Sequence, residues 1–208
     1  MSEIKERPIL YSAPMVRAIL GGRKTVTRRE VKKPAALDCL TAGFEPAFLA
    51  LPGNADLCPY GKVGDRLWVR ETWQADAQVD SVAPRDLSQG EPILYPADGA
   101  SRQTGCSMIA PGKTRPSIHM PRCVSRILLE ITDVRVERLH DISEEQAKAE
   151  GVRLYADHAD LGDWWHVEGI ETYSADPRKS FELLWTSVGG DWNANPWVWA
   201  VEFKRVTP

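Results

Sequence analysis

The order of strand-forming and helix-forming segments is the feature that most constrains the fold of this chain. Two long stretches, residues 125–139 and 196–205, are rich in β-branched and aromatic side chains and predict extended structure. Shorter strands are expected at residues 8–12, 25–30 and 65–73. Residues 125–139 are long for one strand, so a bend is expected near Thr132-Asp133.

Helix signals lie between these strands. Ser12 can cap a helix that the glycines at 21–22 end, and Ser143–Gln146 is a capping box for a helix that Gly151 stops. Asp176, followed by a proline, starts another helix. This order is not a regular strand–helix alternation. It predicts an α+β fold, a mixed β-barrel with helices packed outside.

Three segments carry no clear period and are rich in Pro, Gly and polar residues: 31–61, 74–116 and 152–175. We expect them to be long loop insertions. With 208 residues and 43% hydrophobic content, the chain can bury one sizeable core, so residues 1–208 are predicted to form a single domain.

The net charge of -3 gives no overall attraction to polyanions, so contact with RNA would need a local basic patch. The densest patch spans residues 23–33. No apolar run approaches the roughly 20 residues that cross a bilayer, and the polar N-terminus lacks the apolar core of a signal peptide. We therefore expect a cytoplasmic protein with no membrane partner.

The four cysteines predict free thiols, because none forms a close pair. A zinc site that combines them with His119 is an alternative that the spacing disfavours. We expect neither a metal nor a cofactor.

The segment Gly22–Arg29 is the first candidate for chemistry. By the two-residue period of a strand, Thr25, Thr27 and Arg29 share one face, and Lys24 in the preceding turn can reach the same side. A lysine crowded by arginines loses its proton more easily and could activate a threonine hydroxyl. The alternative is a solvated basic turn.

Glu150 is the second candidate. It ends the helix that starts at the capping box, where a carboxylate opposes the negative end of the helix dipole. Departures of this kind occur at functional sites. The simpler interpretation is a solvated helix face that also carries Glu144 and Glu145.

The strand at 65–73 mixes polar and apolar residues on both faces, which suits a barrel strand with one end at a polar site. Trp68 and Glu71 on this strand are therefore candidates for substrate binding. Trp68 could stack on a base, although large rings more often form the wall of a barrel.

Gly22, Lys24, Thr27 and Arg29 together resemble the signature of the ASCH family, a small β-barrel fold related to the PUA RNA-binding domain. The chain is similar throughout to the longer ASCH-like proteins of bacteriophages and prophages. The shared features are an Arg-Pro-Ile-Leu start, a Gly-Asp-Arg-Leu-Trp-Val-Arg-Glu-Thr-Trp strand and a Pro-Ser-Ile-His-Met-Pro-Arg turn.

The turn, the helix that ends in Glu150 and the last strand are also similar to those of bacterial N4-acetylcytidine amidohydrolases. That resemblance implies catalytic roles for Lys24, Thr27 and Glu150. The substrate-binding candidates are Arg23, Thr25, Arg28, Arg29, Trp68 and Glu71.

The expected function is therefore binding of RNA or a modified nucleoside in a PUA-like pocket, which needs no catalytic geometry. Hydrolysis of an N-acyl amide by Lys24, Thr27 and Glu150 is the second hypothesis. A ribonuclease and a non-catalytic phage interaction protein are the alternatives. A pocket in which Lys24, Thr27 and Glu150 converge would favour the hydrolase.

Overall fold

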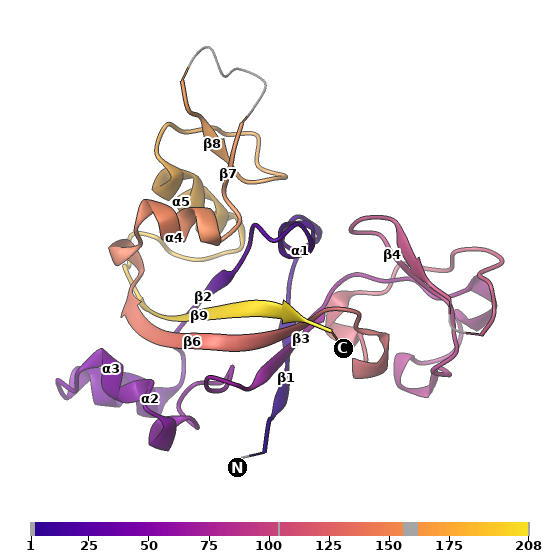
Figure 1. The fold of residues 1–208 in the computed structure, drawn as a ribbon, viewed down its shortest axis with the longest axis horizontal. Helices are drawn as coiled ribbons and strands as arrows, with labels where there is room; N and C mark the ends of the chain where they lie inside the picture. The colour runs from indigo at the N-terminus through magenta and orange to yellow at the C-terminus, as the bar shows by residue number, and fades with distance from the viewer. Residues whose placement is uncertain (1–2, 104, 156–161, 208) are drawn as a thin grey trace.

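The computed structural model describes residues 3–103, 105–155 and 162–207 and is built around a five-stranded sheet (Figure 1). The strand order is β1-β3-β6-β9-β2, in which β1 and β3 are parallel and the other neighbours are antiparallel. The strands are β1 (Glu6–Leu10), β2 (Val26–Glu30), β3 (Arg66–Arg70), β6 (Leu128–Arg138) and β9 (Trp197–Val206). The helices are α1 (Ala13–Leu20), α2 (Pro34–Thr41), α3 (Pro46–Leu49), α4 (Glu144–Ala149) and α5 (Pro177–Ser187).

The long central ladder pairs β6 with β9 from Leu128↔Val206 to Arg138↔Trp197. Its register shifts between Ile131 and Asp133, which marks a bulge. The bend expected at Thr132-Asp133 is therefore confirmed. A bulge bends its strand and increases the local twist, which lets β6 continue as one strand from Leu128 to Arg138.

The α+β class is confirmed, but the closed barrel is not. Within the described residues, β1 and β2 form the two edges of the sheet, and no ladder joins them. Instead β1 runs into α1, and α1 leads the chain to β2 on the opposite edge.

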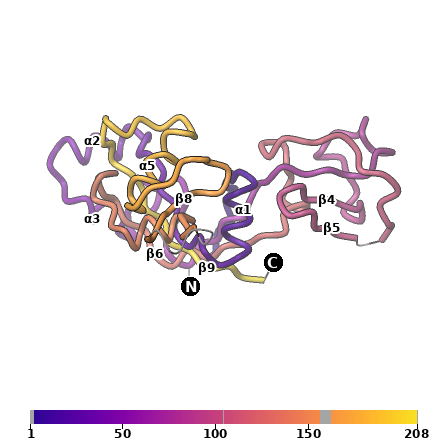
Figure 2. The backbone as a smooth tube through the Cα atoms, turned by 90° about the horizontal axis from the view of Figure 1, so that it is seen from above, coloured from indigo at the N-terminus to yellow at the C-terminus, as the bar shows by residue number. Residues whose placement is uncertain are grey.

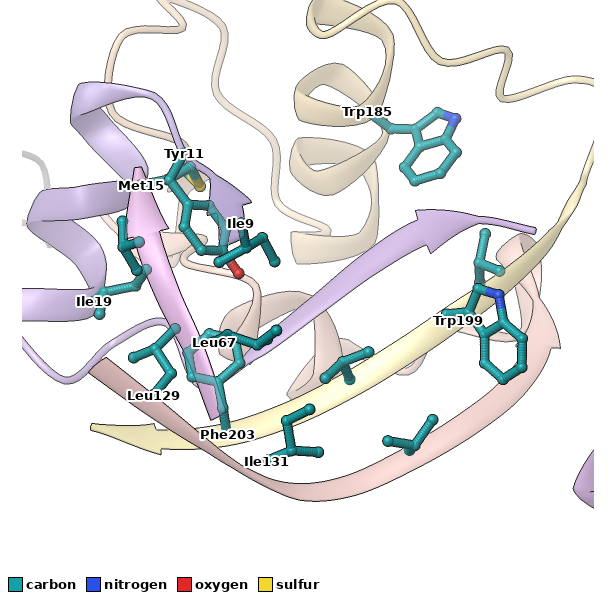
Figure 3. Packing of buried hydrophobic residues seen from close by; sticks show 14 of the residues in the cluster. Ile9, Tyr11, Met15, Ile19, Leu67, Leu129, Ile131, Trp185, Trp199 and Phe203 are labelled. Carbon is teal, nitrogen blue, oxygen red and sulfur yellow. The ribbon is translucent and has the colours of Figure 1, made fainter. Parts of the chain in front are cut away.

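The main core lies where the sheet meets α1 and α5. Figure 3 shows Met15 and Ile19 of α1, Trp185 of α5, and Trp199 and Phe203 of β9 among its members. Full burial of a large apolar side chain contributes about 1.5–3 kcal/mol. This packing holds both helices against the strands that carry the candidate site.

A second, smaller lobe extends to one side of the molecule (Figure 2). It contains the hairpin of β4 (Ile93–Tyr95) and β5 (Ala100–Arg102), and it occupies much of the segment 74–116 expected to be a loop. It has its own buried cluster, which consists of Trp73, Ala75, Leu87, Ile93, Tyr95, Met120 and Val124. A period could not be read from the sequence because most of this lobe is irregular backbone around a few apolar anchors.

The other two expected insertions also contain regular structure. In residues 31–61, Pro34, Pro46 and Pro52 each begin a helical turn, because the fixed φ of proline suits the first helical position. In residues 152–175, β7 (Arg153–Leu154) pairs with β8 (Trp165–His166). Residues 156–161 of this insertion lie outside the described part of the chain.

The predicted caps are largely present. Ser143 and Gln146 form both bonds of the capping box at the start of α4, and the Asp176 side chain accepts a hydrogen bond from the Arg178 amide at the start of α5. Ser12 occupies the N-cap of α1 without a side-chain bond. The four cysteines are free. None of the described helices has the length and apolar character needed to cross a membrane.

Candidate active site

The start of β2 lies against the end of α4. After Gly22, which has a φ of +71°, the amides of Arg23 and Lys24 both donate to the Ala18 carbonyl and turn the chain back. Lys24 then pairs with Glu150 in an isolated antiparallel bridge. Two segments 126 residues apart are joined in this way.

Gly151 makes this approach feasible. Its φ is +104°, a conformation that side chains with a Cβ rarely adopt. A Cβ at this position would lie 3.3 Å from Cβ of Ala18 and 3.6 Å from Cβ of Lys24. The glycine therefore ends α4 and also leaves room for Lys24.

Lys24 is only 3% exposed, and its ammonium group is surrounded by acceptors. Nζ lies 2.9 Å from the Val26 carbonyl oxygen, 2.9 Å from the Glu150 carbonyl oxygen and 2.5 Å from Glu150 Oε2. An ammonium has three donors, and each has a partner here. The alternative of a solvated basic turn is therefore wrong for Lys24.

Arg28 completes a buried network of charges. Its Nη1 donates to Glu150 Oε1 at 3.3 Å, while Nε and Nη2 donate to Glu137 Oε1 at 3.0 and 2.5 Å. Two cations thus face two carboxylates, as buried charges require. Glu150 is 2% exposed, so the simpler interpretation of a solvated helix face is wrong for this residue. Its unfavourable place at the helix end is offset by Lys24 and Arg28.

Burial lowers the pKa of Lys24 below its ordinary value, because the charged form loses its hydration. The Glu150 carboxylate acts in the opposite direction, and the neighbouring charges of Arg28 and Arg29 lower the pKa further. Lys24 consequently gives up a proton more readily than an exposed lysine. This is the behaviour expected of a catalytic base.

A cavity of about 660 Å³ opens beside this network. Five of the residues predicted to act in the site line it: Lys24, Thr27, Arg28, Arg29 and Glu150. The apolar wall of the cavity comes mainly from α5 and the turn after it. This wall consists of Phe181, Leu184, Trp185, Val188, Gly189 and Gly190.

Four predicted site residues lie elsewhere. Arg23 and Thr25 are exposed, and neither is among the described residues that line the cavity. Trp68 is buried under Arg70, whose Cζ lies 4.8 Å from the ring centroid. Glu71 accepts two hydrogen bonds from Arg126, at 2.8 and 2.9 Å.

The cavity also contains residues that the sequence did not single out. Tyr11 and Tyr60 add two rings to its lining, and Glu137 holds Arg28 from β6. The Tyr11 Oη, Arg29 Nε and Trp185 Nε1 atoms are buried without a hydrogen-bond partner. No local signal marked Tyr11 or Glu137, because their roles depend on contacts with distant strands.

Comparisons with known proteins leave the family open. No family model matches the chain, and no curated protein matches it. The crystal structure of protein EF3133 from Enterococcus faecalis V583, of family DUF984, aligns with 100% of this chain and 78% of its own. The TM-score of that alignment is 0.37 and the sequence identity is 12%, which is too low to indicate a shared fold.

Proposed function

We propose that this chain binds a modified nucleoside, free or within RNA, in the cavity beside β2 and hydrolyses an N-acyl amide of the N4-acetylcytidine type. The observation that carries this proposal is the buried Lys24–Glu150 pair on the wall of the cavity. A lysine with a lowered pKa lines the same cavity as the Thr27 hydroxyl, which combines a base and a nucleophile. The proposal includes membership of the ASCH family and a PUA-like arrangement of the strands.

The lining of the cavity suits a nucleobase. Its volume of about 660 Å³ lies within the usual range for small-molecule sites, roughly 300–1,000 Å³. The rings of Tyr11, Tyr60, Phe181 and Trp185 line the cavity, and the half-buried Tyr60 is the most accessible of them for stacking on a base. Arg29 of β2 lines the same cavity, and its unpartnered Nε is a donor for a polar group of the base.

In the proposed reaction, neutral Lys24 takes the proton of the Thr27 hydroxyl while the threonine oxygen attacks the amide carbonyl carbon. The C–N bond then breaks, and Lys24 passes the proton to the departing exocyclic amine. Water hydrolyses the resulting threonine ester, which releases the carboxylic acid and restores the hydroxyl. Arg29, with an unpartnered Nε on the cavity wall, stabilises the oxyanion or holds the base.

Glu150 and Arg28 reduce the free-energy cost of removing a proton from the buried Lys24. When Nζ loses one proton, two N–H groups remain, and these match the carbonyl oxygens of Val26 and Glu150. The Glu150 carboxylate then keeps Arg28 as its partner. With Lys24 neutral, Arg28 is the cation that faces both Glu137 and Glu150, so the Glu150 carboxylate still has a charged partner.

Turnover of N4-acetylcytidine by the purified chain tests the proposal, with chromatography to measure the cytidine released. The wild type should release cytidine, whereas Lys24→Met and Thr27→Val should not. Lys113→Met, an exposed lysine in the small lobe, is the matched control and should retain full turnover. An inactive wild type, or an active Lys24→Met variant, would refute the hydrolase.

Binding without catalysis is the second candidate. The observation that favours it is that all three donors of Lys24 already have partners within the protein. In that case Lys24 forms a structural ion pair with Glu150 beside the pocket. Calorimetry would then show cytidine or a modified nucleoside bound by both wild type and Thr27→Val, with no product formed by either.

A further inference from the structure

Tyr11 lies where β1 leads into α1, beside the strand that carries the candidate nucleophile. Lys24 Nζ lies 5.7 Å from the centroid of its ring, and Arg29 Cζ lies 5.5 Å from it. Lys24 precedes β2 and Arg29 lies within it, with Thr27 between them in the sequence, so the tyrosine ring lies near the stretch that contains the threonine. Burial raises the pKa of Tyr11, and Thr27 acts in the opposite direction, as a hydrogen-bond partner of the hydroxyl would.

The Tyr11 hydroxyl is turned inward and enclosed. The side chain is 6% exposed, and Figure 3 shows its oxygen directed into the protein. This oxygen has no hydrogen-bond partner of normal geometry. An unsatisfied buried hydroxyl costs about 1–3 kcal/mol, so proteins seldom keep one without a role.

Thr27 is the polar neighbour that can use this hydroxyl. Its side chain is 3% exposed, and it lines the same cavity as Tyr11. Burial raises the pKa of Tyr11 above its ordinary value, so the phenol keeps its proton and acts as a donor. A threonine oxygen can accept such a bond and still donate its own proton elsewhere.

We propose that Tyr11 is a positioning residue whose O–H donates to Thr27 Oγ1 and directs the threonine proton toward Lys24. The role rests on the proposed function, because it orients the nucleophile of that reaction. When Thr27 gives its proton to Lys24, the same hydrogen bond stabilises the negative charge that develops on the threonine oxygen. Tyr11 itself forms no bond to the substrate carbon and exchanges no proton.

The kinetic test removes the hydroxyl and keeps the ring. Tyr11→Phe should lower kcat for N4-acetylcytidine on the order of 10- to 100-fold, less than the loss of a whole nucleophile, and leave KM within about twofold. Tyr95→Phe is the matched control, since it deletes another buried tyrosine hydroxyl, one that donates to the Val124 carbonyl in the small lobe. Its kcat should equal that of the wild type. Unchanged kcat in Tyr11→Phe would overturn the positioning role while the hydrolase stands.

A second measurement tests the Tyr11–Thr27 hydrogen bond and does not depend on catalytic activity. Urea unfolding of Tyr11→Phe, Thr27→Val and the double variant forms a double-mutant cycle. We expect the double variant to unfold at nearly the same urea concentration as Thr27→Val alone, because the bond is already lost. If the midpoint shift of the double variant equals the sum of the shifts of the two single variants, the inference is overturned. An inactive wild type with a non-additive cycle would refute the hydrolase and retain the Tyr11–Thr27 bond.

Discussion

The cavity region and the small lobe both bury charged side chains, but they use them differently. In the small lobe, Asp76 accepts hydrogen bonds from the backbone amides of Gln78, Ile109 and Ala110. Arg115 donates to the carbonyl oxygens of Val79 and Val82. These charges tie irregular loops together where no sheet or helix satisfies the backbone.

Beside the cavity, the charges of β2 face carboxylates from β6 and the end of α4. Lys24 bonds to Glu150, and Arg28 bonds to both Glu150 and Glu137. One of these groups, Lys24, has a pKa lowered by burial, and the network borders a cavity. Buried charge alone therefore does not mark a site. A titratable group with access to an open volume does.

The largest effect should come from Glu150→Gln, which keeps the shape of the side chain and removes its charge. Lys24 and Arg28 then lack a full counter-charge, so the pKa of Lys24 falls further and its geometry changes. We expect kcat for N4-acetylcytidine to fall on the order of 10²- to 10⁴-fold. Circular dichroism must show that the variant is folded. Full activity of the folded variant would mean that the charges beside the cavity, like those of the small lobe, have only a structural role.

Arg115→Met should destabilise the small lobe and leave kcat unchanged. The Val79 and Val82 carbonyls lose their donors, and the free energy of unfolding should fall by about 3 kcal/mol. Urea unfolding measures the change, with Arg85→Met as a control because Arg85 is exposed. A loss of kcat per folded molecule would contradict the separation of the lobe from the site.

Gly151→Ala tests how closely α4 and β2 must approach. The alanine is strained at a φ of +104° and its Cβ comes within 3.3 Å of Ala18, which shifts the end of α4 relative to Lys24, so we expect a loss of about 1–3 kcal/mol in stability together with reduced kcat. Gly43→Ala, in the turn after α2, is the matched control, because Gly43 is not among the described residues that line the cavity. It shares a positive φ but has nothing within 4 Å of the added Cβ, and it should lose stability through backbone strain alone. Equal kcat values in the two variants would show that the approach is not critical.

The smallest expected effect is a pH dependence of stability that comes from Asp76 in the small lobe. Hydrogen bonds from the amides of Gln78, Ile109 and Ala110 lower the pKa of Asp76. Because the folded pKa lies below the unfolded value of about 3.9, this group stabilises the fold above that pH, and the stability is lost as the pH falls through the folded pKa. The difference in urea midpoint between wild type and Asp76→Asn should therefore shrink between neutral and strongly acidic pH. A constant difference would contradict the assignment.

The sequence predicted elements well wherever the signal was local. The capping box of α4, the proline after the Asp176 cap and the bend in β6 each depend on neighbouring residues, and all three are present. Local signals failed for the helical turns at Pro34 and Pro46 and for the small lobe. Their short elements are stabilised by packing rather than by any repeated pattern.

The candidate site divides in the same way. Residue types along the chain marked Lys24 beside a threonine and, separately, Glu150 as candidates, and the resemblance to the amidohydrolases implied that Lys24, Thr27 and Glu150 act together. Which residues share one cavity depends on the pairing of β2 with β9 and on the bridge from Lys24 to Glu150. Tyr11 joins them in the cavity and Glu137 holds Arg28 beside it, whereas Trp68 and Glu71 are not among the described residues that line the cavity. Only tertiary structure could decide this, since burial and contacts between residues 126 positions apart arise from the packed fold.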